Sequence, residues 1–114
     1  MQPIEREKVQ QALEAFKNKD VYIHLETTNG AYASHYNENM LNAGAYIRNA
    51  KIRYTRGKIT GDGPYRVGLK LGNGWVYAEG LTDWEIDAKN RLLLAGHNDE
   101  GKLAVALQLS EEPF

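Results

Sequence analysis

The 114-residue chain contains no cysteine, which excludes disulfide bonds, thiolate nucleophiles and sulfur-ligated metal sites. It also lacks any run approaching the ~20 apolar residues that cross a bilayer, and its first residues show no apolar signal region. The formal net charge is only -1 at pH 7, so no overall field draws the chain to nucleic acid or to an anionic membrane. These absences predict a cytoplasmic protein without a membrane partner.

The composition that remains is that of an ordinary globular domain. The chain is 42% hydrophobic and 25% charged, which argues against disorder and against a fibrous repeat. A chain of this length buries roughly 65% of the surface that its unfolded state exposes, so one hydrophobic core is sufficient. No repeat, low-complexity tract or long linker divides it. We therefore expect a single domain over residues 1–114.

The first segment has the period of an amphipathic helix. Four apolar residues follow the spacing i, i+3, i+4, i+7, and polar side chains fill most other positions; the four are Val9, Ala12, Leu13 and Phe16. Pro3 suits the first turn of such a helix. This pattern predicts a helix over about residues 4–18, followed by a β region over about 20–109 and a short C-terminal tail.

From Asp20 onward the apolar period changes to two. The clearest hairpin signal lies in residues 61–81, where two alternating runs flank the turn Gly72-Asn73-Gly74. Residues 44–60 favour β structure for longer than one strand, so we expect a bulge or bend near Asn49 or Gly57. Further strands are predicted near residues 20–26, 31–36, 82–87, 91–97 and 103–109.

This order of elements limits the fold class. Eight or nine short strands with tight turns leave no room for the crossover helices of a parallel sheet, so the pairing should be antiparallel. So many strands in a short chain limit their exposed edges by curling or by forming two layers. We predict a mainly β fold: a small, antiparallel, meander-rich β-barrel preceded by one N-terminal α-helix.

Three ionisable side chains are the candidates for ligand binding: His24, Glu26 and His97. His24 and Glu26 are two residues apart on a predicted strand and share a face, so they could act as an acid/base pair or as two of three metal ligands. The third ligand would come from His97, His35 or Glu79. The alternative is a polar strand face with no ligand. The helical histidine spacing of metalloproteases is absent, so we assign no metal, cofactor or catalytic residue.

A basic segment raises a second possibility. Five cations occur within eleven residues, with Tyr46 and Tyr54 interleaved; they are Arg48, Lys51, Arg53, Arg56 and Lys58. A basic, aromatic strand face can hold single-stranded nucleic acid. However, strand parity separates Arg53 from Tyr54, and the overall charge supplies no attraction. Nucleic-acid binding is therefore unexpected, and a solvated strand or a subunit contact is the alternative.

The predicted hairpin carries a possible protein interface. Trp75 and Tyr77 share one face of its second strand, while Val76 and Ala78 share the other. If the aromatic face is exposed, it forms a recognition surface together with Arg48 and Arg66. The alternative is that the aromatic face belongs to the core.

Several blocks resemble the YojF family of small bacterial proteins, namely residues 22–28, 45–51, 63–70, 74–82 and 101–104, with Ser110 and Glu111. The resemblance covers nearly the whole chain and implies a barrel-type all-β fold. It also implies an accessory role, because family members resemble products encoded beside an LmbE-type deacetylase linked to bacillithiol synthesis. It assigns no catalytic residue.

Three hypotheses follow. The first is a non-catalytic accessory or interaction protein, self-associating and with the LmbE-type deacetylase as a protein partner. The second is a small-molecule-binding protein or metal-dependent hydrolase that uses His24 and Glu26. The third is a protein that binds single-stranded nucleic acid.

Overall fold

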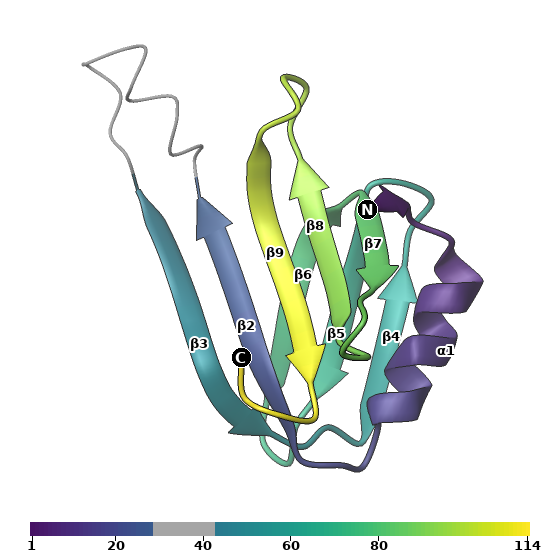
Figure 1. Cartoon of the computed structure of the whole chain (residues 1–114), viewed down its shortest axis with the longest axis vertical. Helices are drawn as coiled ribbons and strands as arrows, with labels where there is room; N and C mark the ends of the chain where they lie inside the picture. The colour runs from purple at the N-terminus through teal and green to yellow at the C-terminus, as the bar shows by residue number, and fades with distance from the viewer. Residues whose placement is uncertain (29–42) are drawn as a thin grey trace.

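The computed structural model describes residues 1–28 and 43–114 (Figure 1). The predicted strand at 31–36 and His35 lie outside the described residues. In the described part the chain is mainly β with one helix, and all strand pairings are antiparallel, as predicted. The elements are β1 (Gln2–Pro3), α1 (Arg6–Phe16), β2 (Val21–Thr28), β3 (Gly44–Ile52), β4 (Arg56–Thr60), β5 (Tyr65–Lys70), β6 (Trp75–Leu81), β7 (Asp83–Ile86), β8 (Leu92–His97) and β9 (Leu103–Ser110).

The strands form two sheets, and no closed barrel is found in the described residues. One sheet has the order β1-β7-β8-β9-β2-β3, and the other has the order β4-β5-β6. The helix α1 explains part of this departure from the prediction, because it covers the outer edge of β4. Gln10 Nε2 donates to the carbonyl of Gly57 at 2.8 Å, and Gln10 Oε1 accepts from the Ile59 N–H at 3.0 Å. Backbone groups that would pair with a closing strand are bonded to a helix side chain instead.

The core lies between the two sheets and under the helix (Figure 1). Buried and outward-facing residues alternate along β4 and the start of β2, as the period of two requires, whereas β5, β8 and β9 each contain three consecutive buried residues. The apolar stripe of α1 packs on the same core. Tyr54 is fully buried and joins the helix to the core, because its hydroxyl donates to the carbonyl of Leu13 at 2.6 Å.

Two local predictions are confirmed. β5 and β6 form the hairpin expected across residues 72–74, with Lys70 opposite Trp75. The break expected near Asn49 is a β-bulge: Ile23 pairs with Ala50 and His24 with Arg48, so Asn49 is the extra residue, at φ 57°. The structure places the helix two residues inside the predicted limits at each end.

Candidate functional site

His24 and Glu26 lie together on the outer face of the six-stranded sheet, as strand parity predicts. His24 Nε2 is 3.6 Å from Glu26 Oε1, and the Arg48 guanidinium donates to His24 Nδ1 at 3.4 Å. The side chain of His24 is only 12% exposed. The imidazole is therefore held between a carboxylate and a guanidinium.

A ring from the C-terminal segment covers this pair. The Phe114 ring meets His24 edge-on at 6.4 Å between centroids, with Arg48 over it at 5.2 Å and Arg91 at 5.5 Å. Figure 1 shows the chain end lying against β2. The Phe114 side chain takes up space beside His24, and the ligand-binding role of His24 and Glu26 stays a prediction.

His97 lies elsewhere. On β9, His24 is opposite Gln108 and His97 is opposite Leu103, five residues or about 16 Å away along the strand. His97 Nδ1 bonds instead to Asp83 Oδ1 at 3.2 Å. The Thr82 hydroxyl donates to the same oxygen at 2.6 Å, and chiefly this bond, with that from His97, lowers the pKa of Asp83 despite partial desolvation.

No metal-binding cluster is evident in the part of the chain that the structure describes: no three His, Cys, Asp or Glu side chains there lie close enough to hold an ion. Glu79, one of the possible third ligands, forms an ion pair with Arg66 at 3.2 Å on the other sheet. The structure thus joins His24 to Glu26 and separates both from His97.

The outer face of the three-stranded sheet gathers Arg66, Trp75 and Tyr77. The Trp75 and Tyr77 rings stack at 5.5 Å with an interplanar angle of 8°, and the Arg66 guanidinium lies 4.0 Å from the Tyr77 centroid. Gly68 is opposite Tyr77 and makes this possible, because a Cβ there would be 2.8 Å from Tyr77 Cε1. Trp75 is 44% exposed and Tyr77 46%. We name Arg66, Trp75 and Tyr77 the aromatic ridge.

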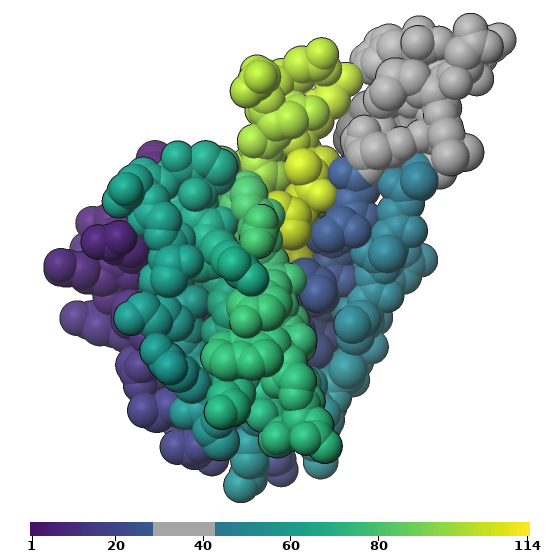
Figure 2. All heavy atoms as spheres, turned by 180° about the vertical axis from the view of Figure 1, so that it is seen from behind, coloured from purple at the N-terminus to yellow at the C-terminus, as the bar shows by residue number. Residues whose placement is uncertain are grey.

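Cations surround the aromatic ridge. Parity and register place Arg56, Lys58 and Lys70 on the same face, which Figure 2 shows from outside across β4, β5 and β6. Among the described residues, none of these three has a carboxylate within 4.0 Å. With Arg66 against Glu79, the face carries a net charge of +3.

Two predicted members of these surfaces lie elsewhere. Arg48 is on the six-stranded sheet beside His24, so it does not join the aromatic ridge. Tyr54 of the basic segment is a core residue with no exposed surface, whereas Tyr46 is 71% exposed on β3. The interleaved tyrosines therefore form no common surface, because one of them faces the helix.

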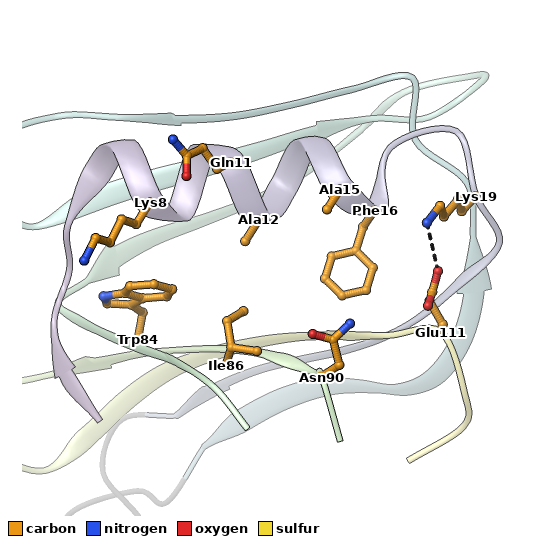
Figure 3. Close-up of a pocket in the computed structure, with 10 residues that line it drawn as sticks. All are labelled: Lys8, Gln11, Ala12, Ala15, Phe16, Lys19, Trp84, Ile86, Asn90 and Glu111. Carbon is orange, nitrogen blue, oxygen red and sulfur yellow. Dashed lines mark ion pairs between the residues drawn. The ribbon is translucent and has the colours of Figure 1, made fainter. Parts of the chain in front are cut away.

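Sequence reasoning missed a groove between α1 and β7. Its cavity has a volume of about 450 Å³ and is lined by small and apolar side chains with a polar rim (Figure 3). The signal was present in Ala12 and Ala15, small residues on the helix, and in Trp84 and Ile86, two apart on a strand. Only the tertiary fold brings these two segments, about seventy residues apart, to face each other.

The described residues contain no helix long and apolar enough to cross a membrane. Fold and surfaces thus define a small, mainly β protein with one covering helix. The chain belongs to the family described as "Protein of unknown function (DUF1806)", whose model matches residues 3–114.

The chain is similar to a known protein both in sequence and in structure. The uncharacterized protein YojF of Bacillus subtilis (strain 168) is 57% identical over 114 residues, which cover 100% of this chain and 98% of the relative. The crystal structure of Bacillus subtilis YojF superposes with a TM-score of 0.83 at 52% identity, over 99% of this chain and 95% of that one. The resemblance noted in the sequence is thereby confirmed.

Proposed function

We propose that the chain is a non-catalytic interaction protein whose contact surface is the aromatic ridge and its surrounding cations. The stack of Trp75 on Tyr77 beneath Arg66 carries this proposal. Trp, Tyr and Arg are the residues that most often dominate binding energy at protein interfaces. Here they are ordered against each other before binding, so association loses little side-chain entropy.

The same stack favours a protein over nucleic acid as the partner. Bases bind to exposed aromatic rings by stacking on a free face. Trp75 lies against Tyr77 on one side, and the register of β5 and β6 puts Arg66 on the side toward Glu79. Both faces of Tyr77 are therefore covered, so a base could stack on the outer face of Trp75 but not on Tyr77, whereas a protein partner can also contact the ring edges.

Charge indicates the kind of partner. A face with net charge +3 complements an acidic protein surface and steers encounter with it. The family resemblance implies the LmbE-type deacetylase as that partner and bacillithiol-related metabolism as the setting. We propose an accessory role beside that deacetylase, in the cytoplasm.

Calorimetric titration of the LmbE-type deacetylase from the same bacterium tests this proposal. Trp75→Ala and Arg66→Ala should each weaken binding by at least about thirtyfold, because anchor residues contribute about 2 kcal/mol or more. Tyr46→Ala, which removes an exposed tyrosine from the other sheet, is the matched control and should bind as the parent does.

Equal weakening by Tyr46→Ala, or no effect of Trp75→Ala, would contradict the proposed surface. Absence of any complex with the deacetylase would exclude that partner. A steeply salt-dependent affinity for single-stranded DNA that Trp75→Ala abolishes would replace the proposal with the nucleic-acid hypothesis.

We also propose self-association through β3. It is the last strand of its sheet, and within residues 1–28 and 43–114 no strand pairs with its outer edge. Its residues are largely exposed, including Ile47, and an open edge of nine residues is a template for antiparallel pairing with a second copy. Ile47→Lys should lower the oligomeric state in sedimentation analysis, whereas Lys51→Gln, on the same strand, should leave it unchanged. A parent chain that sediments as a monomer would refute this arrangement.

A further inference from the structure

The groove between α1 and β7 is distinct from both surfaces described above. Its helix wall is formed by Ala12, Ala15 and Phe16, and its opposite wall by Trp84 and Ile86 (Figure 3). The two alanines keep the helix side open, because a longer side chain at either position would extend into the space between the walls. A volume of about 450 Å³ is within the range of small-molecule sites.

The groove is chemically asymmetric along its length. At one end lies Trp84, which is only 7% exposed, and its indole Nε1 has no hydrogen-bond partner among the described residues. Figure 3 shows this nitrogen at the end where the Lys8 side chain descends from the helix. Among the described residues, Lys8 forms an ion pair only with Glu5, at 3.4 Å, and this exposed pair is a weak interaction.

At the opposite end both members of an ion pair line the groove, whereas Glu5, the partner of Lys8, is not among the lining residues. There Lys19 Nζ pairs with Glu111 at 3.2 Å across the groove (Figure 3). A buried N–H without an acceptor costs free energy, which a bound acceptor would recover. Two donors, an indole N–H and an ammonium, thus meet at one end of an apolar trough, and no carboxylate lines that end.

We propose that this groove binds an amphipathic anion, a small molecule with one carboxylate-type head group and an unbranched apolar chain. The head group lies at the Lys8 end and accepts hydrogen bonds from Lys8 and, after a small shift of the Lys8 stem, from Trp84 Nε1. The apolar chain of the ligand lies between the two alanines of α1 and Ile86, and it extends toward Phe16. From Lys8 to Phe16 the helix rises about 12 Å, which accommodates a chain of medium length.

NMR titration with decanoate, below its micelle concentration, tests the proposal directly. The chain has two tryptophans, so the ¹H–¹⁵N spectrum contains two indole signals, and Trp75→Phe assigns the remaining one to Trp84. Decanoate should move the Trp84 indole signal downfield, as hydrogen bonding requires, and shift the Ala12 and Ala15 amides. Decan-1-ol, with the same chain but no charge, should bind about tenfold more weakly.

Variants of the protein test the contributions of the head group and of the apolar chain separately. Lys8→Gln should weaken decanoate binding by about tenfold and leave decan-1-ol binding unchanged. Lys17→Gln, directly after the same helix and outside the groove, should affect the binding of neither compound. Ala15→Leu should abolish the binding of decanoate and of decan-1-ol, because the larger side chain fills the groove from an exposed helix position. An unmoved Trp84 signal, equal affinity for the alcohol, or full decanoate binding by Ala15→Leu would each overturn the proposal.

Discussion

The side-chain amide of Asn49 forms hydrogen bonds with both the backbone N–H and the backbone carbonyl of Phe114. The Phe114 N–H donates to Asn49 Oδ1 at 2.7 Å, and Asn49 Nδ2 donates to the Phe114 carbonyl at 3.1 Å. Asn49 can do this because it is the extra residue of the bulge, where φ is 57°. A local irregularity of β3 thereby positions the ring that covers His24.

Replacing Asn49 tests the contribution of these two hydrogen bonds to stability. Asn49→Ala should destabilise the protein by about 2–4 kcal/mol, since it loses both hydrogen bonds and since Ala tolerates a positive φ less well than Asn does. Asn49→Gly keeps the backbone conformation and should cost about 1–2 kcal/mol less. Urea unfolding measures both, and hydrogen exchange at the Phe114 amide should accelerate in both. A protected Phe114 amide in either variant would show that other contacts hold the segment.

Tyr54→Phe probes the bond that ties α1 to the core. The Leu13 carbonyl would lose its partner at 2.6 Å inside the protein, so the free energy of unfolding should fall by about 1–3 kcal/mol. Chemical denaturation gives the value. The control is Tyr46→Phe, which alters an exposed hydroxyl and should change stability by less than about 0.5 kcal/mol.

The same hydroxyl predicts a pH effect. Burial, reinforced by the Glu14 carboxylate, raises the pKa of Tyr54 above the ordinary value near 10 that it has in the unfolded chain. Above pH 10 the unfolded chain therefore loses this proton while the folded protein keeps it. Stability should decline by up to about 1.4 kcal/mol per pH unit there, and Tyr54→Phe should lack that part of the decline. Parallel pH profiles of parent and variant above pH 10 would contradict the assignment.

Gly96 of β8 lies tightly against Gly80 of β6, where the two sheets meet. A Cβ on Gly96 would collide with the Gly80 carbonyl and lie 2.6 Å from Val105 Cγ1. Gly96→Ala should therefore cost at least about 3 kcal/mol or prevent folding, because backbone cannot move aside as a side chain can. Gly72→Ala has no atom within 4 Å of the new Cβ and serves as the matched control. Similar thermal midpoints for both variants would show that the sheets can separate at this point.

Thr82 should control the ionisation of Asp83. Its hydroxyl is the main reason that the pKa of Asp83 is lowered, so Thr82→Val should raise that pKa toward the ordinary value. A lowered folded pKa adds stability above the unfolded pKa, and this stability is lost as pH falls through the folded value. The variant should therefore lose less stability in acid. Carbon-13 titration of the Asp83 carboxyl measures the shift, with Thr60→Val as control; an unchanged titration would assign the effect to His97.

Short-range patterns in the sequence predicted much of the local structure. The helix, the hairpin and the bulge each depend on residues a few positions apart, and a period of 3.6 or 2 or a glycine turn is sufficient to indicate them. The pairing of His24 with Glu26 followed from strand parity alone. The predicted barrel was only partly right: the sheets do not close in the described residues, because the edge of β4 is satisfied by Gln10, a residue 47 positions from Gly57.

The candidate surfaces could likewise be predicted from the sequence only in part. Strand parity put Trp75 and Tyr77 on one face, but their exposure depended on the glycine opposite Tyr77 and on which side of the sheet meets the core. The groove beside Trp84 was invisible in the sequence, since its walls come from distant segments with different periods.

The sequence by itself determined where the helix and most strands lie and which side chains share a face, because these depend on the spacing of neighbouring residues along the backbone. Only the tertiary structure decided that the strands form two sheets, that Phe114 covers His24, and that α1 and Trp84 enclose a groove. Those outcomes depend on contacts between segments far apart in the chain, and such contacts leave no period for a single sequence to reveal.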